Sequence, residues 1–168
     1  MPLSMYQASV PAFLQILSAL TAILDKAAAH CEAKKIDPSV ILNARLFPDM
    51  YPTVRQVQIA TDHAKGAAAR LAGVEVPSYP DTEATFDQLK ERIAKTISFV
   101  SSVKQEQIDG SENRPIRVKA GPVELNFTGQ QYLVNFALPN FYFHASTAYD
   151  LLRHNGIDIG KRDFLGAI

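Results

Sequence analysis

Apolar residues recur every three or four positions along four long segments of the chain, which is the spacing of helices that bury one face. In the first segment the apolar stripe includes Phe13, Leu17 and Leu24, and Pro11 lies close to the start of the helix. The predicted helices cover residues 5–33, 54–72, 82–103 and 129–154. Most connections between them are short, which favours antiparallel packing of neighbouring helices.

Capping residues mark the starts of these helices. Thr53 is placed to cap the second helix, whose alanine-rich second half predicts close approach by its neighbours and hence a central position. Asp81 or Thr82 is placed to cap the third helix, with Glu83 in its first turn. The polar face of that helix, which includes Arg92, should be solvated.

The hydrophobic period changes between the third and fourth helices. Residues 116–119 and 123–127 alternate between apolar and polar side chains on either side of an Ala-Gly-Pro turn, which predicts a two-stranded hairpin. Thr128 is placed to cap the fourth helix, and Pro139 should kink or break it. These elements predict an all-α antiparallel four-helix bundle with a small β-hairpin between helices 3 and 4. We expect it to form a single domain over residues 1–168.

Composition narrows the possible functions. Seventeen basic and seventeen acidic residues give a formal net charge of zero, which argues against a broad nucleic-acid-binding surface. The single cysteine, Cys31, cannot form an internal disulfide, which fits a reducing cytosol. We find no apolar run of the roughly 18 residues needed to span a bilayer. We therefore expect a cytoplasmic protein that binds neither nucleic acid nor membranes.

His144 lies inside the most aromatic segment of the chain, on the fourth predicted helix. At helical spacing it shares a stripe with Asn140. A polar group inside a bundle must be hydrogen-bonded, metal-bound or open to a pocket. His144 is therefore a candidate for lining a ligand or metal pocket, and the alternative is a core histidine hydrogen-bonded to a tyrosine or asparagine. Neighbouring aromatic residues such as Tyr149 could line the same cavity or belong to a simple core.

Several segments together resemble a known family, and they comprise residues 3–6, 43–50, 129–132, 143–144, 151–156 and 160–165. Through them the chain resembles an uncharacterised bacterial family, a domain of unknown function grouped with the DinB/YfiT-like metalloenzymes. The resemblance covers essentially the whole chain. It implies a four-helix bundle that forms a homodimer, which light scattering can test.

Metal-binding members of that superfamily use three histidines, one on the second helix and a pair four residues apart on the last. His144 matches the second histidine of the pair, but the first falls at Asn140, and asparagine binds divalent transition metals poorly. His63 is the only histidine of the second helix, and helical geometry favours an exposed position for it. Asp62 is the neighbouring alternative. The metal site is thus degraded, or it uses a different ligand set.

Two functions are open. The first is a pocket around His144, Asn140, Tyr149 and Asp62 that binds a small molecule or a divalent metal such as zinc, nickel or manganese, with His144 and His63 as metal ligands. If the protein is an enzyme, the resemblance implies metal-dependent transferase or hydrolase chemistry, with His144 as ligand or general base. The second is a non-catalytic dimeric interaction protein whose histidines are structural. Metal analysis of protein purified without a histidine tag bears on this choice.

Overall fold

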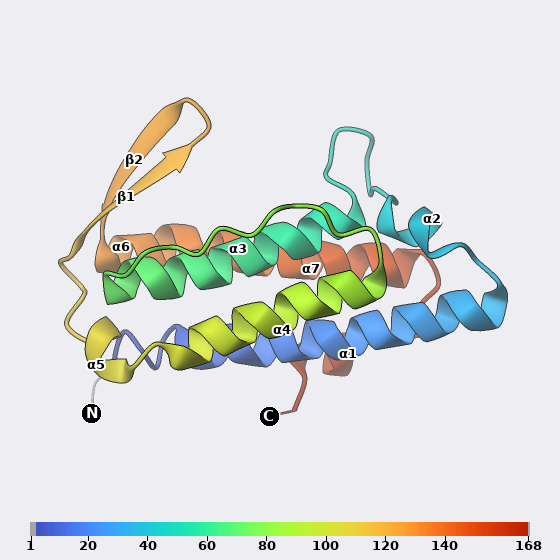
Figure 1. The fold of residues 1–168 in the computed structure, drawn as a ribbon, viewed down its shortest axis with the longest axis horizontal. Helices are drawn as coiled ribbons and strands as arrows, with labels where there is room; N and C mark the ends of the chain where they lie inside the picture. The colour runs from blue at the N-terminus through green and yellow to red at the C-terminus, as the bar shows by residue number, and fades with distance from the viewer. Residues whose placement is uncertain (1–2, 168) are drawn as a thin grey trace.

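The computed structural model describes residues 3–167, which are mostly helical with one small antiparallel hairpin (Figure 1). Four long helices lie side by side, and α3 packs against both α7 and α4, while α1 packs mainly against α4. They are α1 (Val10–Lys34), α3 (Thr53–Ala72), α4 (Phe86–Ser102) and α7 (Leu138–His154). The shorter elements are α2 (Pro38–Leu42), α5 (Gln105–Ile108), β1 (Pro115–Ala120), β2 (Val123–Thr128), α6 (Gly129–Tyr132), η1 (Leu133–Ala137) and α8 (Lys161–Leu165). The prediction of a largely helical chain with one hairpin is therefore confirmed.

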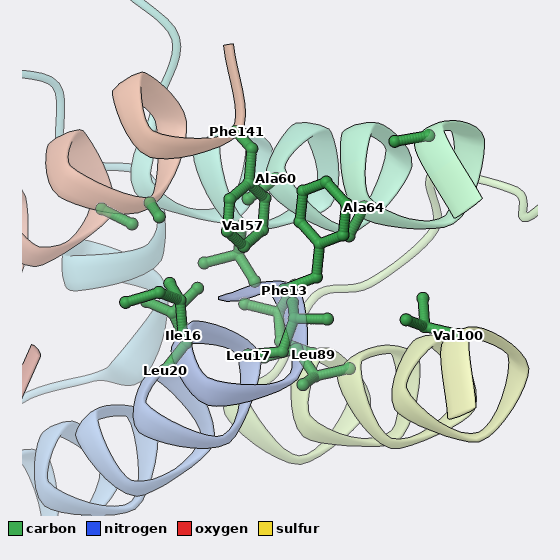
Figure 2. Close-up of a cluster of buried hydrophobic side chains, with 14 of the residues drawn as sticks. Phe13, Ile16, Leu17, Leu20, Val57, Ala60, Ala64, Leu89, Val100 and Phe141 are labelled. Carbon is green, nitrogen blue, oxygen red and sulfur yellow. The ribbon is translucent and has the colours of Figure 1, made fainter. Parts of the chain in front are cut away.

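The core lies between the long helices, and large apolar side chains pack against small ones on α3 (Figure 2). Phe13 of α1 and Phe141 of α7 are fully buried and meet edge to face, with ring centroids 4.9 Å apart. Ala60 and Ala64 of α3 are also fully buried. Their small side chains let neighbouring helices approach closely, so the predicted central position of this alanine-rich helix is confirmed.

The helix α1 is long and apolar enough to cross a membrane, with a mean hydropathy of 1.4 over 18 residues. The prediction that no apolar run reaches this length therefore needs correction. In the fold, the apolar side chains of α1 face the other helices, and Leu17, Leu20 and Leu24 are fully buried. A core helix gives the same length and hydropathy as a membrane span, because both are apolar on most of their surface.

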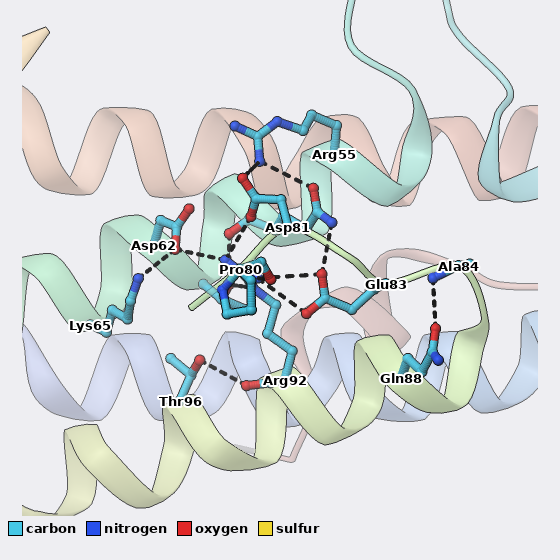
Figure 3. A network of polar contacts seen from close by, with 12 residues as sticks. Arg55, Asp62, Lys65, Pro80, Asp81, Glu83, Ala84, Gln88, Arg92 and Thr96 are labelled. Atoms are coloured by element: carbon cyan, nitrogen blue, oxygen red, sulfur yellow. Dashed lines mark hydrogen bonds and ion pairs between the residues drawn. The ribbon is translucent and has the colours of Figure 1, made fainter. Parts of the chain in front are cut away.

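Two predicted helix caps are corrected by the structure. Thr53 begins α3 without a side-chain capping bond. The helix α4 begins later than predicted, and its cap is Thr85 rather than Asp81 or its neighbour. Asp81 and Glu83 instead pair with Arg92, which is buried and not solvated (Figure 3). A buried guanidinium needs compensating carboxylates, and this requirement directs both acidic residues away from the helix start.

The predicted cap of the last helical segment is confirmed, because the Thr128 hydroxyl accepts a hydrogen bond from the Gln131 N–H at 3.4 Å. Pro139 does not break this segment, since the chain stays helical from α6 through η1 into α7. Directly before the proline, η1 is a π-helical turn in which the Leu138 N–H donates to the Leu133 carbonyl. A proline has no N–H and its ring crowds the preceding turn, so a wider turn accommodates it.

Gly129 lies where β2 meets α6, against the backbone of Ser111. A Cβ at position 129 would collide with the Ser111 carbonyl oxygen, a backbone atom that cannot rotate away. We therefore predict that Gly129→Ala lowers the free energy of unfolding by about 2 kcal/mol or more. Urea denaturation measures this change.

Gly160→Ala is the matched control, because no atom of the described residues, 3–167, lies within 4 Å of a Cβ built at that position. Its effect should stay below about 1 kcal/mol, the usual loss when alanine replaces glycine at the start of a helix. Equal effects of the two substitutions would contradict a tight junction at Gly129.

Candidate functional site

A cavity of about 550 Å³ lies between α3, the η1–α7 segment and the tip of the hairpin. Its volume is within the usual range of small-molecule sites. Most of the wall contributed by α3 consists of residues spaced four or seven positions apart, which share one helix face, and Asp62 lies at the edge of that face next to His63. The lining residues are Tyr51, Arg55, Ile59, Asp62, His63 and Arg70, with 118–121 of the hairpin and Phe136, Asn140 and His144 of the last helical segment.

Two polar stripes meet at this cavity. Gln56, His63 and Arg70 are seven positions apart on α3, so two turns bring each of them back to nearly the same face. Asn140 and His144 are four positions apart on α7. The helical pattern of the last segment predicts the second stripe. The stripe on α3 was not predicted from the sequence. The signal that identifies it is the seven-residue spacing of polar side chains in an alanine-rich helix.

The interaction between Gln56 and His144 joins the two stripes. Gln56 Nε2 donates to the Tyr51 carbonyl oxygen at 3.0 Å, and a carbonyl can only accept, so the amide orientation is fixed. Gln56 Oε1 therefore faces His144 and accepts a hydrogen bond from its Nδ1–H at 2.7 Å. In the neutral ring this assigns the proton to Nδ1 and leaves a lone pair on Nε2. The prediction of tyrosine or asparagine as the partner of His144 is thus corrected to glutamine.

The Nε2 atom of His144 is free to bind something else. It has no hydrogen-bond partner within residues 3–167. In that range, Ser111 Oγ is the only fully buried side-chain nitrogen or oxygen that lacks a hydrogen-bond partner. The unpartnered Nε2 atom of His144 is therefore not fully buried, and solvent reaches it. Burial, and then the charge of Arg55, lower the pKa of His144, so the ring is neutral near pH 7. The cavity therefore contains a hydrogen-bond and proton acceptor.

His63 lies beside His144, with the two ring centroids 5.8 Å apart and the ring planes 11° from parallel. Its ring also meets Phe136 edge-on, at a centroid distance of 5.8 Å. The prediction of an exposed helix histidine is therefore wrong, since His63 is partly buried. The reason is that α3 packs against α4 on one side and α7 on another, so it has more than one inward face.

Asp62 connects the cavity to a network of ion pairs on the α4 side (Figure 3). Its Oδ1 accepts from Lys65 Nζ at 2.6 Å and from Arg92 Nη2 at 2.8 Å. Arg92 also contacts Asp81 at 3.1 Å and Glu83 at 3.1 Å. Burial alone would raise the pKa of Glu83, but its hydrogen bonds and the charge of Arg92 lower it overall. Asp62 is thus held by two cations, and its charge is largely compensated within the protein.

The other two predicted pocket residues have different positions. Asn140 lines the cavity, and its Nδ2 donates to the Phe136 carbonyl at 2.7 Å within the helix. Tyr149 does not line it, because its ring packs edge-on against Phe164 of α8, with centroids 5.8 Å apart. Of the predicted pocket residues, the structure therefore brings His144, Asn140 and Asp62 together and leaves Tyr149 elsewhere.

A solved structure shares this helical architecture, and a family model covers most of the chain. A family model described as Domain of unknown function (DUF1993) matches residues 5–165. The chain belongs to this family. A DinB family member protein from Shewanella denitrificans, known from a crystal structure, is similar at 39% sequence identity with a TM-score of 0.87, and the match covers 97% of this chain and 92% of that chain. No curated protein matches the chain. The predicted relationship to an uncharacterised DinB-like family is confirmed.

A DinB-like relationship implies a metal, but the residues around the cavity of this DUF1993 protein do not fit a three-ligand site. His144 and His63 provide two neutral imidazoles. Asn140 is a poor ligand for divalent transition metals, and Asp62 is already paired with two cations. Within residues 3–167, no three side chains among His, Cys, Asp and Glu are placed to hold a metal ion. The chemistry available here is that of a neutral imidazole acceptor surrounded by other polar groups.

Protonation of His63 should destabilise the fold. Burial first, and then the charges of His144 and Arg70, lower its pKa from 6.5 to about 4, against an opposing effect of Asp62. The unfolded chain therefore takes up a proton near pH 6.5, whereas the folded chain does so only near pH 4. Stability that is present above pH 6.5 is lost as the pH falls through this window, by about 3 kcal/mol at most.

We predict that His63→Asn flattens the pH dependence of the free energy of unfolding between these two pH values, as measured by urea denaturation. His154→Asn, at an exposed position near the end of α7, serves as the control and should keep the wild-type slope. A His63→Asn slope identical to that of the wild type would show that His63 is not held neutral by the fold.

Proposed function

We propose that this DUF1993 protein binds a small organic molecule in the cavity between α3 and α7, and that His144 Nε2 accepts a hydrogen bond from a hydroxyl, amine or thiol of that molecule. The observation that carries the proposal is the acceptor itself. Gln56 fixes the ring through Nδ1, while Nε2 has no hydrogen-bond partner within residues 3–167, and the His144 side chain lines a cavity of about 550 Å³. An acceptor atom that has no hydrogen-bond partner at a cavity favours a ligand that can donate a hydrogen bond to it.

The packing of the helices supports a preformed site. We propose that α1, α3, α4 and α7 form the antiparallel four-helix bundle expected from the sequence, with the cavity on its α3–α7 side. Ligand pockets commonly lie between the helices of such bundles. Because Gln56 and His144 belong to two different long helices, the ring is held by rigid elements, and binding requires little ordering of the chain.

Tyrosol, which carries a phenol donor on a flat apolar ring, is a suitable probe for this acceptor. We predict that its titration into ¹⁵N-labelled protein shifts the NMR signals of His63 and Asn140, which line the cavity. His144→Phe keeps a ring of similar size but has no acceptor, so the affinity for tyrosol should fall several-fold, the usual effect of losing one hydrogen bond between neutral groups. His154→Phe, outside the cavity, should bind like the wild type.

Two results would contradict the proposal. One is an unchanged affinity for tyrosol in His144→Phe, and the other is a set of shifted signals confined to residues outside the cavity. Zinc, nickel or manganese, added singly, provides a further arm. A rise in Tm with one of these ions that disappears in His144→Phe would replace the organic ligand with a metal, since binding to the folded state raises Tm.

A further inference from the structure

We propose that the ligand of this cavity is an anion, a carboxylate or a phosphate, whose charged group is bound by Arg70 and whose apolar body lies against Ile59 and Phe136. This inference rests on the proposed function, because it names the chemical class of the molecule that donates to His144. It is carried by the balance of charges around the cavity and by the position of Arg70.

The lining of the cavity carries more positive than negative charge. Arg55, Arg70 and Lys119 are its cationic residues, and Asp62 is its only carboxylate within residues 3–167. Asp62 Oδ1 is already paired with Lys65 Nζ at 2.6 Å and with a buried arginine of α4 at 2.8 Å. The cavity is therefore an electropositive environment, and an anionic ligand is the species that compensates it.

Arg70 is the cation best placed to hold such a group. Arg55 has a carboxylate partner, because its Nη1 lies 2.6 Å from Asp81. Arg70 has none within residues 3–167, and the only side-chain hydrogen bond it makes there is donated by Nη1 to the Tyr132 hydroxyl at 3.2 Å. A partly buried guanidinium normally has a carboxylate partner. Its remaining N–H groups suit the bidentate recognition of a carboxylate or phosphate.

The spacing along α3 determines how the ligand must be built. Arg70 is seven residues beyond His63, which corresponds to about 10 Å along the helix axis. The Arg70 side chain folds back along α3, however, because its Nη1 lies against the place that a Cβ would take at Gly66. Since His63 lies beside His144, the anion site and the acceptor are closer together than this backbone rise. Ile59, Phe136 and Val118 supply apolar wall to the same cavity. The matching ligand has a hydrogen-bond donor at one end, an anionic group at the other and a flat or apolar body between them.

A series of isosteric probes tests the charge. The probes 4-hydroxyphenylacetate, tyrosol and tyramine share the phenol that donates to His144 and carry an anionic, neutral or cationic tail. Calorimetric titration should show about tenfold tighter binding of 4-hydroxyphenylacetate than of tyrosol, and the weakest binding for tyramine. 4-Hydroxybenzylphosphonate distinguishes the two sources of charge, because tighter binding than the carboxylate assigns the site to phosphate-bearing ligands and weaker binding assigns it to carboxylates.

Arg70→Gln should weaken the binding of 4-hydroxyphenylacetate and so remove its advantage over tyrosol, and a Tm close to that of the wild type shows that the variant is folded. Arg70→Lys keeps the charge and should retain part of the preference. Arg117→Gln is the control for long-range electrostatics, because this exposed arginine of β1 does not line the cavity. It should bind both probes like the wild type.

The outcomes separate the two proposals. Equal affinities for tyrosol and 4-hydroxyphenylacetate in the wild type, or an undiminished preference in Arg70→Gln, would overturn the anion site while leaving a neutral pocket at His144. A loss of preference as large in Arg117→Gln as in Arg70→Gln would assign the effect to the general field and also overturn the site. Failure of every probe to bind at concentrations up to about 10 mM would overturn the pocket itself.

Discussion

The position of α3 between α4 and α7 is the constraint on which the rest of the structure depends. A helix with neighbours on two sides has little surface left for solvent, so each of its polar groups must find a partner in another element. The alanines meet this constraint by packing, as Ala60 and Ala64 are fully buried. The polar residues meet it through contacts between helices, and those contacts produce both the ion-pair network and the cavity.

Two adjacent residues of α3 show how this works. Asp62 is held from the α4 side by Arg92, whereas His63 lies beside His144 of α7. Consecutive positions on a helix point about 100° apart, so one turn can supply polar groups to two different neighbours. On the α4 side, the charge of the buried guanidinium is compensated by the carboxylates that surround it. The α7 side keeps an imidazole acceptor and an arginine that has no carboxylate partner in the part of the chain that the structure describes, and that difference makes it the candidate site.

The sequence allows the helical class, the hairpin and the cap at Thr128 to be predicted, because these depend on local periodicity and local hydrogen bonds. It does not reveal that Arg92 is buried or that His63 faces a cavity, since both depend on which helices pack against which faces. The sequence also does not reveal how the helix accommodates Pro139, because the π-helical turn before the proline forms within a packed segment. The partner of His144 was missed because Gln56 is distant in sequence and carries no motif.

The central claim is that the fold holds His144 neutral, with its proton on Nδ1 and its Nε2 open. Long-range ¹H–¹⁵N NMR of the histidine side chains at pH 7 tests this most directly, because the two ring nitrogens have different shifts in each tautomer. The account predicts a protonated Nδ1 and an unprotonated Nε2 for His144, and a mixture of tautomers in Gln56→Leu. A proton on Nε2, or a doubly protonated ring at that pH, would contradict it.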